Sequence, residues 1–122
     1  MRPAIVWPEP PRWSRQELVR RLAALLRGRA ERVLLIGSHA ARRATADSDV
    51  DLILVHETSL PWPERGSAFA DLRRTFGAMD LIVYTPSEWL ALSRRPTPFL
   101  REARKTWVSV LGRAPQSGAT LT

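Results

Sequence analysis

The stretch from Asp49 to His56 constrains the fold of this chain more than any other segment. Its side chains alternate between two faces, and beyond the acids Asp49 and Asp51 both faces are apolar. A strand that is apolar on both faces has to be covered on both sides by other elements. We therefore expect an α/β architecture in which the two carboxylates lie at one exposed end of this strand.

Other segments also carry secondary-structure signals. Short apolar runs predict three further strands, at Val33–Ile36, Met79–Tyr84 and Trp107–Leu111. Capping signals and leucine spacing predict four helices: one from the capping box Ser14–Glu17 to Gly28, one at Ser67–Phe76, and two that begin at Thr85–Pro86 and Thr97–Pro98. Pro61, Trp62 and Pro63 are expected to interrupt the chain ahead of the second helix, and Gly37 to open a tight turn after the first strand.

The domain organisation follows from length and composition. A chain of 122 residues with 44% hydrophobic content is expected to form one domain, at 14–112, with one modest core. Residues 1–13 contain four prolines and are expected to form an extended arm with Trp7 and Trp13 as anchors. Residues 113–122 are small and polar, and we expect them to be disordered.

Charge and composition narrow the classes of function. The net charge of +7 comes almost wholly from arginine, since Lys105 is the only lysine, and guanidinium groups suit contacts with phosphate. The absence of cysteine excludes disulfides, thiol nucleophiles and thiolate metal sites. No apolar stretch approaches the roughly 20 residues of a membrane span, and the N-terminus lacks a signal-peptide core. We therefore expect a cytoplasmic protein without membrane contact and with an anionic partner.

Three acids form the candidate catalytic centre. Asp49 and Asp51 stand at positions i and i+2 of one strand, with backbones about 6.5 Å apart, so their carboxylates can converge on two ions about 4 Å apart. Asp80 opens the next strand. Oxygen ligands of this kind select Mg²⁺ or Mn²⁺. We expect Asp49 and Asp51 to bridge both ions, and Asp80 to ligate the ion that binds an acceptor hydroxyl and to help take its proton.

Gly37 and Ser38 are the candidate nucleotide-binding residues. They stand where a strand gives way to a turn, so that an unhindered backbone and a hydroxyl can approach the oxygens of a triphosphate. Arg42 and Arg43 lie in the sequence between the Gly37-Ser38 pair and the acids of the next strand. They could add a contact to the same phosphates, although exposure to solvent is an equally good interpretation. His39 and His56 are interpreted as ordinary surface or strand-end residues.

These motifs resemble the minimal nucleotidyltransferases of the DNA polymerase beta superfamily. The resemblance is carried by Gly37-Ser38-x₁₀-Asp49-x-Asp51, by Asp80 in the third strand, and by the later stretches Tyr84–Glu88 and Pro98–Glu102. It implies a mixed β-sheet flanked by helices, two Mg²⁺ ions, Ser38 on the triphosphate, and the three acids as the metal-binding triad. One departure is that members often read Ala-Arg-Gly where this chain has Ala40-Ala41-Arg42.

The resemblance also suggests a substrate. Stand-alone members of this size are often encoded beside a small helical HEPN protein, act as its antitoxin, and transfer AMP from ATP to a tyrosine of that partner. The alternative is a catalytically silent protein of the same fold that neutralises a partner by complex formation. Direct action on nucleic acid is not favoured, because no nucleic-acid motif appears and the arginines are dispersed. A calcium loop is excluded because Leu52 and Thr58 replace its glycine and its glutamate.

Overall fold

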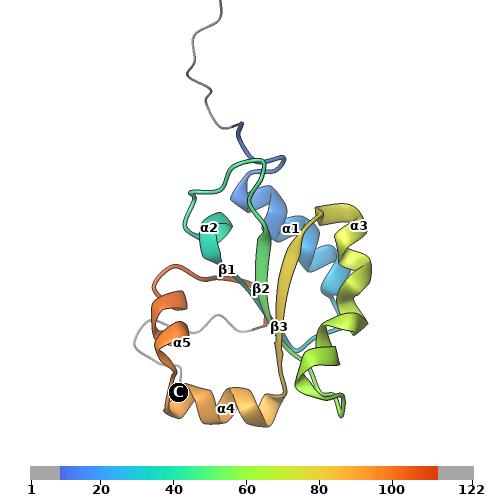
Figure 1. Ribbon diagram of the computed structural model, residues 1–122, viewed down its shortest axis with the longest axis vertical. Coiled ribbons are helices and arrows are strands. Elements are labelled where there is room, and N and C mark those ends of the chain that lie inside the picture. The colour runs from blue at the N-terminus through green and yellow to red at the C-terminus, as the bar shows by residue number, and fades with distance from the viewer. Residues whose placement is uncertain (1–8, 113–122) are drawn as a thin grey trace, which may run out of the picture.

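A computed structural model describes residues 9–112 of the chain (Figure 1). The expectations for the first part of the proline-rich arm, with Trp7, and for the C-terminal tail at 113–122 lie outside the described residues. The helical elements are α1 (Arg15–Leu26), α2 (Gly37–Ala40), the 3₁₀ helix η1 (Trp62–Leu72), α3 (Arg73–Phe76), α4 (Pro86–Arg94) and α5 (Pro98–Ala103). The strands are β1 (Arg32–Ile36), β2 (Val50–Val55), β3 (Met79–Tyr84) and β4 (Val108–Leu111).

The four strands form one mixed sheet. Their spatial order is β3-β2-β1-β4, with β1 antiparallel to both β2 and β4, and β2 parallel to β3. The crossover from β2 to the parallel β3 runs through η1 and α3. The predicted fold class, a mixed sheet flanked by helices, is confirmed.

Helices cover both faces of this sheet (Figure 1). On one face, α1 and η1 pack leucines and Phe69 against the odd-numbered residues of β1 and β3 and the even-numbered residues of β2. On the other face, Trp89 of α4 and Leu100 of α5 pack on Ile53 and Val55. The strand Asp49–His56 was predicted to be covered on both sides, and Leu52 to Val55 are all buried. Burial on both faces makes β2 the centre of the core.

The start of α1 follows the predicted capping signal only in part. The Ser14 side chain accepts a hydrogen bond from the backbone N–H of Glu17, as an N-cap serine should. The Glu17 carboxylate, however, binds Arg20 and Arg21 on the exposed side of the helix. Leu18, Leu22 and Leu26 are buried, whereas 42% of Leu25 is exposed. Three of the four leucines at helical spacing, Leu18, Leu22 and Leu26, therefore anchor α1.

The segment around Pro61 corrects one prediction. Pro61, Trp62 and Pro63 were expected to interrupt the chain, but helical structure begins at Trp62 with Pro63 in its first turn. Proline is well tolerated there, because the first N–H groups of a helix have no partner within it. The predicted helix Ser67–Phe76 is thus the second part of a longer segment, which ends at Gly77 as expected. None of the helices between Glu9 and Gly112 combines the length and apolar composition needed to cross a bilayer.

Candidate metal and nucleotide site

Two of the predicted acids are neighbours across parallel strands. Asp51 of β2 pairs in register with Asp80 of β3, and on its other side with Ile36 of β1. Residues in register on adjacent strands are roughly 4.8 Å apart and point to the same face. This is the face that carries Ile53 and Ile82 further along the same strands. The sheet therefore brings Asp51 and Asp80 together on one face, near the start of both strands.

Asp49 lies two residues before Asp51, at the end of the loop that leads into β2. Side chains at i and i+2 of an extended chain share a face, so Asp49 extends the pair of acids. The loop is held at this point by a hydrogen bond of 3.0 Å from the backbone N–H of Val50 to the carbonyl oxygen of Ala78. The three predicted metal ligands thus come from two adjacent strand starts, with Asp51 half-buried and Asp49 and Asp80 exposed.

The electrostatics of Asp51 reflect this crowding. Burial raises the pKa of its carboxyl group above the usual value, and the negative charges of Asp80 and Asp49 raise it further. The imidazole of His39 partly offsets the effect. No ion pair to an arginine or lysine within residues 9–112 relieves any of the three acids. A basic protein that leaves three acids together without cations has a local charge that a divalent metal ion could neutralise.

Gly37 faces Asp51 directly. Its φ is +76°, a conformation that favours glycine, and a Cβ placed on it would collide with Oδ2 of Asp51 and lie 3.2 Å from Cγ. Only a residue without a side chain allows the backbone and the carboxylate to approach so closely. The predicted tight turn at Gly37 is instead a single turn of helix, α2, in which the backbone N–H of Ala41 donates to the carbonyl oxygen of Gly37.

The other predicted phosphate contacts are placed differently. Ser38 is half-buried beside Gly37, and its carbonyl oxygen accepts from the backbone N–H of Arg43. Arg42 and Arg43 are exposed. Arg42 has a φ of +60° and borders a cavity of about 360 Å³ between the start of α1 and α2, which none of the three acids lines. The structure therefore places Gly37 and Ser38 at the acids, and gives Arg42 a separate cavity.

His39 departs from its interpretation as a surface residue. Only 8% of it is exposed, and its Nε2 lies 3.3 Å from the carbonyl oxygen of Ser48. His56 is half-buried at the end of β2, as a strand-end residue should be, and packs edge-on against Phe69 with ring centroids 5.2 Å apart. No local sequence signal indicated that His39 is buried.

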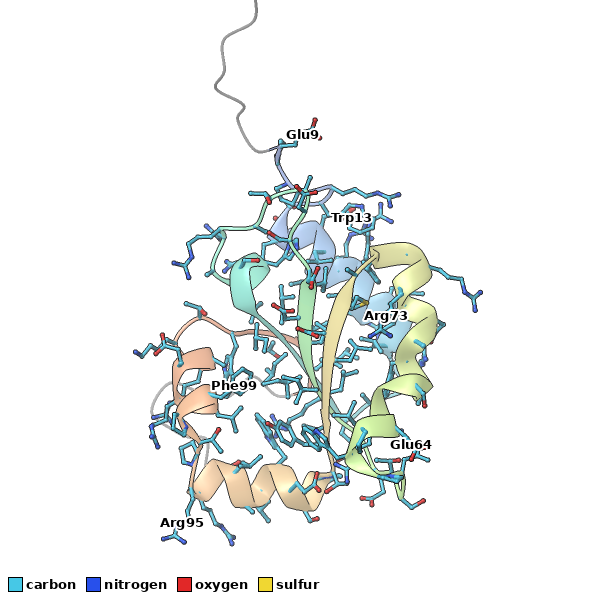
Figure 2. The ribbon with its side chains drawn as sticks, viewed as in Figure 1. Glu9, Trp13, Glu64, Arg73, Arg95 and Phe99 are labelled. Carbon is cyan, nitrogen blue, oxygen red and sulfur yellow. The ribbon has the colours of Figure 1, made fainter. Side chains whose placement is uncertain are left out.

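A groove opens beside Asp80. It has a volume of about 360 Å³ and lies between η1 and the outer strand β3, with Asp80 among the residues that line it, together with Trp62, Arg65, Ser67, Arg73 and Ile82. Figure 2 shows Arg73 between β3 and the helical segment to its right, where its guanidinium donates to the carbonyl oxygen of Met79 at 3.1 Å. Of the three acids, Asp80 alone lines this groove, which lies on the other side of the sheet order from Gly37 at the end of β1.

The donor set fits a hard divalent cation. Within residues 9–112 no group of three or more acidic or histidine side chains is already drawn together around one point. Free carboxylates repel one another, so side chains on this scaffold do not need to converge until a cation is bound. The chemistry of three carboxylates, with no sulfur or nitrogen ligand among them, matches Mg²⁺ or Mn²⁺. Asp49, Asp51 and Asp80 are the residues that would hold such ions.

Comparisons with known proteins support the fold. No family model matches this sequence, and no curated protein matches it. Among solved structures, a toxin-antitoxin crystallised with AMP-PNP superposes with a TM-score of 0.53 at 14% identity, over 83% of this chain and 75% of that one. A mutant of the toxin-antitoxin MntA-HpeT superposes over 83% of this chain and 75% of its own, at 12% identity and with a TM-score of 0.48. The first likeness shows a shared fold.

Proposed function

We propose that this chain is a Mg²⁺-dependent nucleotidyltransferase that moves a nucleoside monophosphate, AMP from ATP, onto an acceptor hydroxyl. The observation that carries the proposal is the pairing of Asp51 with Asp80 in register, with Gly37 pressed against the Asp51 carboxylate. Bound Mg²⁺ would neutralise charge on the phosphates and make the acceptor hydroxyl more acidic.

The order of the strands gives each residue a role. Gly37 and Ser38 stand at the end of β1, the three acids at the starts of β2 and β3, and the groove beyond β3. In phosphoryl transfer the attacking and leaving oxygens lie roughly in line, on opposite sides of phosphorus. Gly37 and Ser38 would therefore hold the leaving pyrophosphate, while Asp80 would orient the acceptor at the groove.

The proposed step transfers the α-phosphoryl group to the acceptor and releases pyrophosphate. The acceptor oxygen bonds to the α-phosphorus, the bond from that phosphorus to the bridging oxygen breaks, and pyrophosphate leaves with the bonding electrons. The hydroxyl proton passes to the Asp80 carboxylate and from there to solvent, since Asp80 is exposed. Asp49 and Asp51 would hold the cations.

The partner follows from family resemblance and from the structural likeness. One solved neighbour is a toxin-antitoxin crystallised with AMP-PNP, an ATP analogue. We propose that this chain is the antitoxin of such a pair and that its acceptor is a tyrosine of a small helical HEPN-type protein. The silent alternative is disfavoured because all three acids are retained, without arginine or lysine partners among the described residues.

The test uses ATP labelled at the α- or the γ-phosphorus, Mg²⁺ and the protein encoded next to this chain. The proposal predicts that the partner acquires label from α-labelled ATP only, and that Asp51→Asn lowers the rate by at least about 10³-fold. Asp47→Asn is the matched control, because Asp47 is an exposed acid of the same loop. Label from the γ-position would indicate a kinase. Neutralisation of the partner without any label would support the silent alternative.

A further inference from the structure

His39 is the one buried ionisable side chain near the acids that the proposed chemistry does not use. It directly follows Ser38 on α2, and only 8% of it is exposed. Buried polar side chains are nearly always hydrogen-bonded, and the partner of His39 is the carbonyl oxygen of Ser48, 3.3 Å from Nε2. Because a carbonyl oxygen can only accept, the imidazole carries its hydrogen on Nε2 in this contact.

The position of this contact in the chain matters. The Ser48 carbonyl belongs to the same planar peptide unit as the backbone nitrogen of Asp49. A donor that fixes this carbonyl also fixes the direction in which the chain enters Asp49. The hydrogen bond therefore acts one bond away from a predicted metal ligand, although His39 lies ten positions earlier in the sequence.

Other contacts hold the loop further from Asp49. The Ser48 hydroxyl accepts from the backbone N–H of Thr45 at 2.9 Å, and the backbone N–H of Ala46 donates to the carbonyl oxygen of Glu9 at 2.9 Å. These bonds shape the turn before Asp49, and beyond Asp49 the backbone N–H of Val50 donates to the carbonyl oxygen of Ala78. Within the described residues, the contact from His39 is the only hydrogen bond to the carbonyl oxygen of Ser48.

We propose that His39 is a positioning residue, whose Nε2–H bond to the Ser48 carbonyl orients Asp49 toward Asp51 and thereby sets the affinity of the site for divalent cations. The inference rests on the proposed function, because it takes the acids as metal ligands. It also connects the two halves of the motif, since the turn that presents Gly37 and Ser38 to phosphate is the turn that aims Asp49.

The test measures Mn²⁺ affinity of the full chain by electron paramagnetic resonance, without nucleotide or acceptor. His39→Leu keeps the volume but removes the donor, and we expect about a 10-fold loss of affinity, typical for partners that orient metal ligands. His39→Gln restores an N–H at similar reach and should stay within about 3-fold of the wild type. His56→Leu is the matched control and should leave the affinity unchanged.

A second readout does not depend on metal. In the metal-free protein, hydrogen exchange at the Asp49 amide should quicken in His39→Leu and recover in His39→Gln. The inference is overturned if His39→Leu binds Mn²⁺ as tightly as the wild type. It is also overturned if His39→Leu and His39→Gln lower the Mn²⁺ affinity equally. Absence of Mn²⁺ binding by the wild type would overturn the proposed metal site itself, and with it this inference, so the two failures are distinguishable.

Discussion

The two ends of strands β2 and β3 are built on opposite principles. At their beginnings, on one face of the sheet, Asp49, Asp51 and Asp80 gather like charges without a cation from the described residues. At their far ends, the same face carries a row of aromatic rings from four segments, Trp62, Tyr84, Trp89 and Trp107, with successive ring centroids 5.3, 5.8 and 5.9 Å apart.

The difference lies in what each end contributes. The aromatic end buries large side chains under α4 and α5, and adds an ion pair of 2.6 Å between Arg65 and Glu88. The acidic end concentrates repulsion that no ion pair among the described residues relieves. Natural proteins commonly retain destabilising features where function needs them and offset them elsewhere. We therefore interpret the aromatic end as the source of stability and the acidic end as the site of chemistry.

The largest effect is expected at the aromatic end. Trp89 is 8% exposed and contacts both Tyr84 and Trp107, so Trp89→Ala should lower the free energy of unfolding by about 3–5 kcal/mol. Trp62→Ala is the control, because 52% of Trp62 is exposed and its loss should have a much smaller effect. Urea unfolding followed by circular dichroism measures both. Equal losses would mean that the aromatic row is not a buried core.

The next effect concerns the close approach at the acidic end. Gly37→Ala places an alanine at a positive φ and makes its Cβ collide with Asp51. Gly77→Ala also places an alanine at a positive φ, +78°, but nothing lies within 4 Å of the Cβ that it adds. The backbone term is about 1 kcal/mol at each position, and the collision should add about 2 kcal/mol at Gly37. Matched urea curves give the difference. Identical losses would show that Gly37 and Asp51 are not in contact.

A smaller effect is expected from the ion pair at the aromatic end. Hydrogen bonds from Arg65 hold the pKa of Glu88 below its usual value. A depressed folded-state pKa contributes stability above the unfolded pKa, and this is lost as the pH falls through the folded value. Glu88→Gln should thus lower the free energy of unfolding by up to about 1 kcal/mol at pH 7. The gap should close below about pH 4; a gap that persists in acid would rule out the ion pair as its cause.

The smallest stability effect has the opposite sign. Burial and the neighbouring acids raise the pKa of Asp51, so the metal-free protein loses stability as the pH rises from the unfolded pKa through the raised folded pKa. Asp51→Asn removes this repulsion and should stabilise the metal-free protein at pH 7, on the order of 1 kcal/mol or less. The gain should vanish in acid, while Asp47→Asn should show none. Thermal unfolding without metal at several pH values checks the sign, and a destabilised Asp51→Asn would contradict the comparison.

Much of the fold was readable from local signals. The spans of β2 and β3 and the caps of α4 and α5 follow from alternation and from threonine-proline starts, which act within a few residues. The start of helical structure at Trp62 was not readable, because a proline pair marks an interruption or a first helical turn equally well. The exposure of Leu25 also depends on which neighbours cover α1, a tertiary property.

The candidate site was predicted by residue type but not by arrangement. Spacing indicated that Asp49 and Asp51 share a face, whereas the register that sets Asp80 beside Asp51 depends on parallel pairing across a long crossover. His39 shows the same limit: nothing local indicates that the ring is buried, and its contact with Ser48 requires the loop to fold back. Long-range contacts carry the information that sequence patterns lack.

The central claim is that the three acids hold divalent cations and, through them, a nucleotide. The most direct measurement is anomalous diffraction at the manganese edge from crystals grown with Mn²⁺ and a non-hydrolysable ATP analogue. The account predicts Mn²⁺ between Asp49 and Asp51, with Asp80 on one ion and the triphosphate at Gly37 and Ser38. Manganese or nucleotide bound elsewhere, with the three carboxylates in contact only with solvent, would contradict it.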